Sequence, residues 1–232
     1  DLETTGVDPS RDRILELAAT QGQELPHTRG GIFSEVVHVP EEIQESANAQ
    51  AAAKVHGITD DEIARGTPFP ESWARFLMFT DACLNNAILD GSDESDDDPS
   101  LPRPPDAPPS LLLVGHNSIR FDFAVLLFEC ARHKLSKTPL RQWLFDDTMH
   151  VLETTKSELG GACLKLQCLF NSIASARDLR AHRALDDCLA LRCVVHNVAY
   201  RLGCSVTELM RRFACSWDEL ESMAQIAALT DD

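Results

Sequence analysis

Two acidic residues near the start of the chain have the spacing of a metal-binding pair. Asp1 and Glu3 stand two apart in the segment Asp1-Leu-Glu-Thr-Thr-Gly6. In a β-strand, residues two apart point to the same face, so both carboxylates would lie together while Leu2 faces the core. Adjacent carboxylates repel each other unless a cation neutralises them, which a divalent metal would do. A solvated acidic terminus would explain the pair about as well.

A third acid lies where a strand is expected to give way to a helix. The apolar residues 111–115 predict a buried strand, and His116-Asn-Ser-Ile-Arg-Phe-Asp122 follows directly. Ligands collect at the strand ends of α/β sheets, so Asp122 would stand beside the first two carboxylates. In the simpler interpretation, which is compatible with the first, Asn117 turns the chain and the helix macrodipole stabilises Asp122.

A histidine and a fourth acid make up the third motif, His182-Arg-Ala-Leu-Asp-Asp187. An offset of five residues does not bring two side chains onto one helical face. We therefore expect His182 on a loop and Asp187 on the helix that follows. Histidine titrates near neutral pH, so beside a metal cluster it is a natural base for deprotonating a water. Taken alone, the motif is explained more simply as a surface histidine near a helix start.

The segments that must position these motifs alternate between strand and helix patterns. Strands are predicted at 13–21, 32–39, 111–115 and 140–145, with a polar, glycine-containing turn between the first two. Helical periodicity and capping signals predict helices at 41–64 (interrupted at 55–58), 70–89, 120–134, 149–155, 164–173, 184–202, and after Ser205 and Ser216. Clustered early strands followed by strand–helix alternation indicate an α/β fold with a mixed sheet.

The composition changes abruptly between about residues 90 and 110. Residues 90–106 hold seven acidic residues against one arginine, and residues 90–110 contain half of the twelve prolines of the chain. So little apolar surface cannot form a core, and we expect a disordered or extended insertion. A solvated loop is a simpler interpretation than a proline-rich ligand for a partner domain.

Taken together, the three motifs resemble those of the DnaQ-like (DEDDh) family of 3′→5′ exonucleases, which have a ribonuclease H-like fold. The matching segments are DxETTG at Asp1–Gly6, NxxxFD at Asn117–Asp122 and HxxxxD at His182–Asp187. The similarity extends to about Leu202 and includes Val55–Thr59, Asp147-Thr148 and Leu164–Leu166. The second motif looks like the three-prime repair exonucleases, whereas Val55–Thr59 and the third motif look more like proofreading subunits.

The resemblance implies a role for each matching residue. Asp1, Glu3, Asp122 and Asp187 would bind two Mg²⁺ or Mn²⁺ ions, and His182 would act as the general base. Hard oxygen ligands suit these cations. By their positions in the family, Thr4 and Val7 would touch the terminal nucleotide, and Asn117 and Phe121 would lie near the site. Phe121 could equally be a core residue. The exonuclease domain would span 1–204, with the insertion at about 90–110, followed by a C-terminal helical extension at 205–232 packed on or appended to the domain.

The implied activity is metal-dependent removal of 5′-mononucleotides from single-stranded 3′ ends, with DNA favoured over RNA. The net charge of −16 argues against a broadly basic nucleic-acid surface, but gripping a short 3′ end needs only metals and a few local contacts. The alternatives are an RNA-trimming exoribonuclease and a catalytically silent module that binds nucleic acid or protein. Protein partners would use the C-terminal helices or the proline-rich insertion, although packing on its own domain is the simpler role of those helices.

Two further expectations concern the environment of the chain. The eight cysteines form no CxxC pair and fall among apolar residues, which indicates small buried side chains in a reducing, intracellular compartment, with nucleus or cytoplasm favoured over an organelle. No apolar run approaches the roughly 20 residues of a membrane span. Because the family places its first aspartate at the end of a central strand, we also expect four to seven mostly apolar residues upstream of Asp1, roughly one strand.

Overall fold

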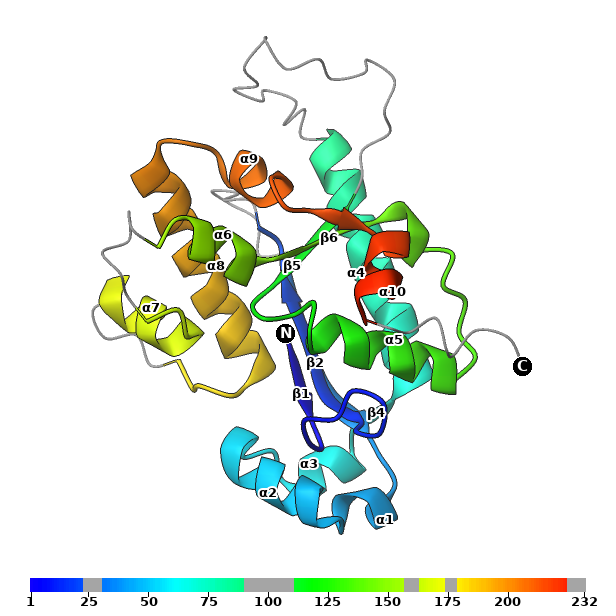
Figure 1. The fold of residues 1–232 in the computed structure, drawn as a ribbon. Helices are drawn as coiled ribbons and strands as arrows, with labels where there is room; N and C mark the ends of the chain where they lie inside the picture. The colour runs from blue at the N-terminus through cyan, green and yellow to red at the C-terminus, as the bar shows by residue number, and fades with distance from the viewer. Residues whose placement is uncertain (23–30, 90–110, 157–162, 174–178, 225–232) are drawn as a thin grey trace.

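A computed structural model describes residues 1–22, 31–89, 111–156, 163–173 and 179–224 (Figure 1). The predicted insertion at 90–110 and the turn between the first two predicted strands lie outside the described residues. Helices surround two sheets, and each sheet has both parallel and antiparallel pairs, which confirms the α/β class with mixed pairing expected from the sequence. Within the described residues, none of the helices combines the length and hydropathy needed to cross a membrane.

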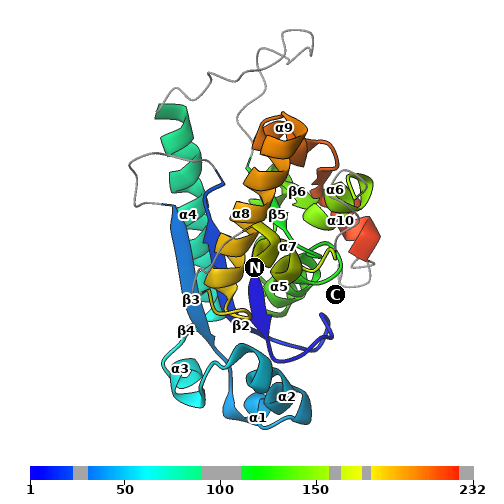
Figure 2. The ribbon, with the colours of Figure 1, turned by 90° about the vertical axis from the view of Figure 1, so that its left-hand side faces the viewer.

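The first sheet carries the start of the chain. Its order is β1 (Leu2–Thr4), β2 (Ile14–Thr20), β3 (Ile32–His38) and β4 (Thr67–Pro68). The first three strands run antiparallel, and β4 pairs parallel with β3. Glu3 stands opposite Glu16 in the register of β1 and β2, and a bulge follows between Glu3 and Thr4. Helix α8 packs against β2, and α4 packs against β3 (Figure 2).

The second sheet contains β5 (Leu112–Gly115), β6 (Leu144–Asp147) and β7 (Cys215–Ser216). Strands β5 and β6 are parallel, and β7 pairs antiparallel with β6. The strand predicted at 140–145 is wrong in its first half, because residues 140–142 form a 3₁₀ turn. Pro139, in the helical region of backbone space, begins that turn, and extended structure starts only after it.

The helices follow the predicted signals closely. They are α1 (Glu41–Gln44), α2 (Ala47–His56), α3 (Asp60–Ala64), α4 (Phe69–Leu89), α5 (Asp122–Arg132), α6 (Thr148–Thr154), α7 (Leu166–Ile173), α8 (Ala184–Leu202), α9 (Val206–Arg211) and α10 (Trp217–Ala224). Gly57 and Gly203 end α2 and α8 in the left-handed conformation that glycine tolerates. Thr59 and Glu62 form the predicted capping box of α3. At α9 only Ser205 caps, because Glu208 pairs with Arg212 instead.

Two large apolar clusters hold these elements together. One contains Trp73, Phe76 and Phe145 and receives Trp217 and Leu220 from α10. The other joins α6, α7 and α8 with Leu209 and Met210 of α9. The cysteines are all free thiols, and Cys130, Cys188 and Cys215 are buried as expected. Cys163 and Cys168 are exposed, contrary to that expectation, because they lie on the solvent side of the start of α7.

Candidate active site

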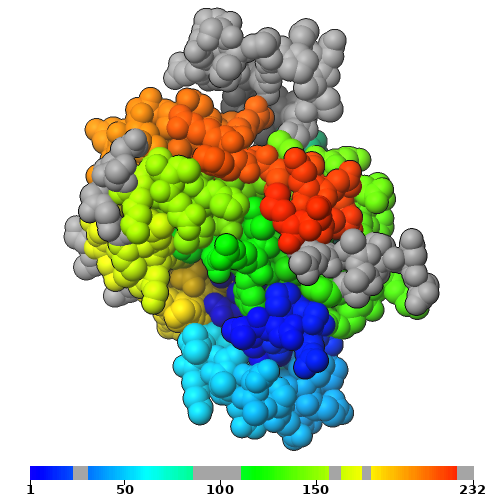
Figure 3. All heavy atoms as spheres, viewed as in Figure 1, coloured from blue at the N-terminus to red at the C-terminus, as the bar shows by residue number. Residues whose placement is uncertain are grey.

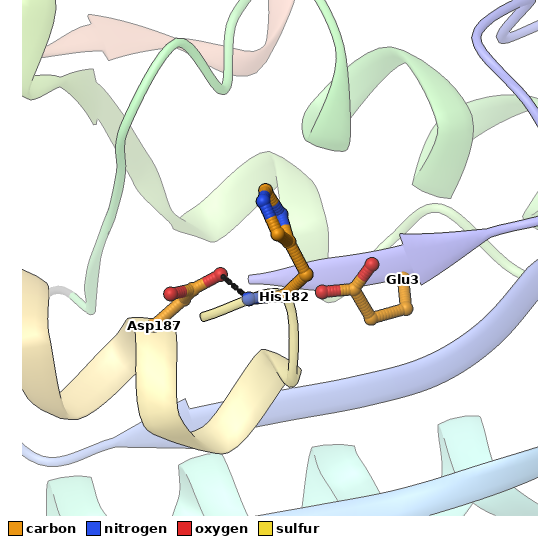
Figure 4. A group of neighbouring side chains, drawn as sticks. All are labelled: Glu3, His182 and Asp187. Carbon is orange, nitrogen blue, oxygen red and sulfur yellow. Dashed lines mark hydrogen bonds between the residues drawn. The ribbon is translucent and has the colours of Figure 1, made fainter. Parts of the chain in front are cut away.

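Three of the predicted site residues converge on one point (Figure 4). Each of Glu3, His182 and Asp187 offers one ligand atom, and these atoms all lie within 4.8 Å of one another. Glu3 comes from β1, His182 from the turn before α8, and Asp187 from the first turn of α8. The backbone N–H of His182 donates to Asp187 Oδ2 at 3.1 Å. The prediction that the histidine lies on the loop and the aspartate on the helix is confirmed.

Asp122 and Asp1 border this group without belonging to it. Asp122 is the first residue of α5, and its Oδ1 accepts the backbone N–H of Leu2 at 3.0 Å, which fixes the carboxylate against β1. Asp1 exchanges two backbone hydrogen bonds with Ala18, at 3.0 and 3.1 Å, and so extends the pairing of β1 with β2. The site therefore draws on β1, α5 and the start of α8, which meet on one face of the molecule (Figure 3).

The acidic side chains of the site hold their protons more tightly than free carboxyl groups. Burial, with the charges of Asp187, Glu16 and Asp122, raises the pKa of Glu3 to about 8. Burial also raises the pKa of Asp122 and of Asp187, although the N–H donors of Leu2 and His182 oppose the shift. Clustered buried carboxylates that resist ionisation are relieved by a cation, and an oxygen-rich set beside one imidazole fits Mg²⁺ or Mn²⁺.

The loop after β1 is folded around Asp12. Thr5 Oγ1 donates to Asp12 Oδ1 at 3.0 Å, and the Asp8 N–H donates to Asp12 Oδ2 at 2.8 Å. A Cβ at position 6 would collide with the Asp12 carboxylate, which explains the glycine of the first motif. In this loop conformation Val7 is 87% exposed. Thr4 is buried, and its hydroxyl donates to the carbonyl of Gly6 at 2.6 Å.

The loop before Asp122 is held by Asp147. Its Oδ1 accepts the N–H of Asn117 at 2.7 Å, and its Oδ2 accepts the N–H of Ile119 at 3.1 Å. The same carboxylate caps α6 by accepting the Met149 N–H at 3.0 Å. Asn117 is exposed in the left-handed region with φ 59°, in keeping with the predicted turn. Phe121 is half-buried and packs against the first apolar cluster.

A buried ion cluster connects the first two motif loops. Glu129 of α5, 1% exposed, accepts the guanidinium of Arg13 at 2.6 Å and that of Arg132 at 2.6 Å. Arg132 also donates to the carbonyl of Ser10 at 3.1 Å. Because α5 begins at Asp122, these contacts fix the loop after β1 relative to that carboxylate.

Several supporting residues were missed or left as structural in the sequence analysis. Glu16, Glu129 and Arg183 carry no local signal, because their partners are distant in sequence, and the local role of Asp12 was also missed. Asp147 was noted only as part of the family resemblance, and its bonds to the second motif were not foreseen. His56 accepts the Ile58 N–H and is buried, and His196 bonds to the carbonyl of Gly22, so both side chains have structural partners outside the acidic group.

The first 91 residues match the exonuclease family RNase_T. Along 97% of its length the chain is 28% identical to the chloroplastic/mitochondrial exonuclease DPD1 of Arabidopsis thaliana, and it spans 63% of that relative. Among solved structures, Escherichia coli exonuclease I in complex with a dT13 oligonucleotide superposes with a TM-score of 0.60 at 16% identity, over 88% of this chain and 40% of that one.

A second solved structure has a length closer to that of this chain. The nuclease domain of 3′hExo, a DEDDh family member bound to rAMP, has a TM-score of 0.57 at 18% identity, over 88% of this chain and 90% of that one. Likenesses this distant show the fold alone. The match over residues 1–91, the relative and the shared ribonuclease H-like fold all agree with the resemblance of the three motifs to the DnaQ-like exonucleases.

Proposed function

We propose that the protein is a divalent-metal-dependent 3′→5′ exonuclease. It would act on single-stranded 3′ ends, DNA in preference to RNA, and release 5′-mononucleotides. The observation that carries the proposal is the convergence of Glu3, His182 and Asp187, with Asp122 fixed beside β1. Carboxylates and an imidazole from distant segments do not gather by local propensity, and the raised pKa values of Glu3 and Asp187 favour a cation between them.

Each residue has a distinct part in the proposed hydrolysis. Asp1, Glu3, Asp122 and Asp187 would hold two Mg²⁺ or Mn²⁺ ions. These ions supply the Lewis acidity that activates a water and stabilises the leaving 3′ oxygen. His182 would take the proton of the attacking water, since its exposed imidazole lies within reach of the acidic group. The chain's own contribution is therefore to hold acidic ligands in place and to present one exposed proton acceptor.

The substrate-binding assignments differ in how well their surroundings suit them. Val7 and Asn117 are exposed on the loops that border the acids and suit contact with the terminal nucleotide. Thr4 is buried, so its contribution would be to shape the loop that carries Val7. Phe121 is only half-buried and could present an edge to the base. Contacts with only the last few nucleotides need no broad basic surface and are therefore compatible with the net charge of −16.

The polymer and the compartment also belong to the proposal. One solved neighbour carries a dT13 oligonucleotide, and another is described as recognising the 3′ end of a histone mRNA stem-loop. We favour DNA and retain exoribonuclease activity as the alternative. The Arabidopsis relative is named for chloroplasts and mitochondria, so an organelle stands beside the nucleus and cytoplasm as a place of action. Free thiols at all eight cysteines suit any reducing compartment.

The test is degradation of 5′-labelled single-stranded DNA and RNA, with Mg²⁺, Mn²⁺ or EDTA. Wild type should shorten the labelled strand stepwise from its 3′ end and release mononucleotides, and EDTA should stop it. Asp122→Ala should reduce kcat by at least about 1000-fold. The matched control is Asp218→Ala, which removes an exposed acid at the first turn of α10 and should retain full activity.

The possible outcomes separate the competing functions. Activity in EDTA, or full activity of Asp122→Ala, would refute the two-metal mechanism. A wild-type protein that binds oligonucleotides without shortening either polymer would support the catalytically silent module. Faster degradation of RNA than of DNA would support the exoribonuclease alternative.

A further inference from the structure

A buried carboxylate that the proposed chemistry does not use lies directly behind the site. Glu16 of β2 stands opposite Glu3 of β1, and directly opposed residues of an antiparallel pair share a face. Its side chain is only 3% exposed. A buried charge is strongly destabilising without partners, so the groups that pair with Glu16 define its role.

Its partners come from the residues that immediately follow His182. Arg183 donates from Nε to Glu16 Oε2 and from its terminal nitrogen to Oε1, both at 3.1 Å, which is a two-pronged guanidinium–carboxylate pair. The backbone N–H of Ala184 donates to Glu16 Oε2 at 3.0 Å. Ala184 is fully buried beside Ala18 of the same strand. The start of α8 is thus anchored to β2 at the position facing Glu3.

The backbone of His182 explains why such an anchor is needed. His182 has φ 65°, in the left-handed region that residues with a Cβ rarely adopt. Such a conformation persists only when its surroundings fix it. On one side the His182 N–H is bonded to Asp187, and on the other Arg183 is bound to Glu16.

A second acid forms an ion pair with the same guanidinium through its other terminal nitrogen. Arg183 lies 3.6 Å from Glu62 Oε1 of α3. Glu62 is itself fixed by the capping box with Thr59. Arg183 therefore connects β2, α3 and α8 and is only 24% exposed along its side chain. Its orientation is determined by two carboxylates that are each held in place independently.

We propose that Arg183, held by Glu16, is the positioning residue that sets the His182 imidazole relative to Glu3 and Asp187. The inference deepens the proposed function and rests on it for the kinetic consequence. The planar guanidinium forms two parallel hydrogen bonds to one carboxylate and so fixes the orientation of the side chain. A lysine ammonium has the same charge but does not fix the orientation in this way. Loss of the fork should let the His182 turn relax from its strained conformation while α8 stays packed through its apolar face.

The kinetic test compares Arg183→Lys and Glu16→Gln with wild type at saturating metal. Both variants should lower kcat by about 10- to 100-fold, the effect of misplacing a catalytic group by about an ångström. KM should stay within about threefold, and the melting temperature should fall only slightly. The control is Arg212→Lys at the exposed Arg212–Glu208 pair of α9, which should match wild type in all three quantities.

A second measurement needs no substrate and separates this inference from the proposed function. The NMR order parameter of the His182 N–H should be near that of rigid backbone, about 0.85, in wild type and below about 0.6 in Arg183→Lys. An inactive wild type with this difference would count against the proposed function alone. Wild-type kcat and an unchanged order parameter in Arg183→Lys would overturn the positioning role. If neither variant folds, the pair is required by the whole fold, and the assignment is likewise overturned.

Discussion

At the scale of single residues, the acids and the histidine of the site are held in different ways. Glu3, Asp122 and Asp187 are constrained by strand pairing or by backbone N–H donors, and each has a raised pKa. The side chain of His182 is exposed, and the bond that ties this residue to Asp187 comes from its backbone. This difference suits metal ligands that are fixed by their surroundings and a proton acceptor whose imidazole is open to solvent.

Replacing His182 by alanine should therefore affect chemistry and not stability. We expect kcat to fall by about 100- to 10,000-fold, the range for loss of a general base. The melting temperature and the Mn²⁺ affinity should be unchanged, because an exposed imidazole contributes little to packing. Single-turnover kinetics, thermal melting and Mn²⁺ titration check these points. A large loss of Mn²⁺ affinity would instead make His182 a metal ligand.

Asp146 gives a prediction for stability that is independent of activity. The residue is fully buried, and burial raises its pKa from 3.8 to about 6. Because the folded-state value lies above the unfolded one, folding favours the protonated form. No penalty exists below about pH 4, and the penalty grows as pH rises to about 6 and stays constant above it.

Asp146→Asn should remove that penalty. Its free energy of unfolding should exceed that of wild type by an amount that increases between pH 4 and 6, reaching on the order of 1 kcal/mol. Urea unfolding at pH 4, 5, 6 and 7.5 measures the difference. Parallel pH profiles for the two proteins would show that Asp146 ionises freely in the folded state.

At the scale of elements, the motif loops are held by buried acids that accept their backbone N–H groups. Asp12 does this within the loop after β1, and Asp147 does it from the end of β6 to the loop after β5. The parallel pairing of β5 with β6 places Asp147 beside Gly115, where that loop begins. The position of Asp122 thus depends on a strand that is distant in sequence.

Asp147→Ala should loosen the second motif as a whole. The N–H groups of Asn117, Ile119 and Met149 would lose their acceptor, which should lower the free energy of unfolding by about 2 to 4 kcal/mol. Activity should fall as well, since α5 starts at the end of the loosened loop. Denaturant unfolding and the nuclease assay check both effects, with Asp218→Ala as the exposed control. Unaltered stability would show that the loop holds itself in place.

At the scale of the whole molecule, an apolar cavity separates the two sheets. It has a volume of about 220 Å³ and is lined by β2 and β5, by residues of α4, α8 and α9, and by Asp1 and Leu2. The expectation that four to seven apolar residues precede Asp1 remains a prediction. The cavity gives it a physical test, because a strand in this place would pair with the free edge of β2 beyond Ala18.

Five apolar, β-branched residues added before Asp1 should stabilise the fold. Burial of that strand should add about 2 kcal/mol, which corresponds to an increase of about 4 to 8 °C in melting temperature. The control is a glycine-serine extension of the same length, which cannot fill the cavity. Thermal melting of the two extended proteins beside the unextended one decides the matter. An equal effect of both extensions would mean that no strand enters the cavity.

The sequence by itself determined most of the local structure and the chemistry of the site. Capping residues, left-handed glycines and hydrophobic periodicity are local signals, so helices such as α8 and the turn at Gly57 were predicted almost to the residue. The three motifs supply four acids and His182, and this combination at these spacings indicates metal-dependent hydrolysis. The strand at 140–145 was half wrong because a short apolar run does not distinguish a strand from a 3₁₀ turn.

Only the tertiary structure decided which side chains meet and what holds them. The contacts Glu16–Arg183, Arg13–Glu129 and Asp147–Asn117 join residues 167, 116 and 30 positions apart, and no local pattern encodes them. Their strength comes from burial, which makes an unpaired charge or N–H unfavourable and therefore fixes its partner. The same burial raises the pKa values of the acids. The residue types of the site can thus be predicted from the sequence, whereas the geometry and the electrostatics of the site arise from packing.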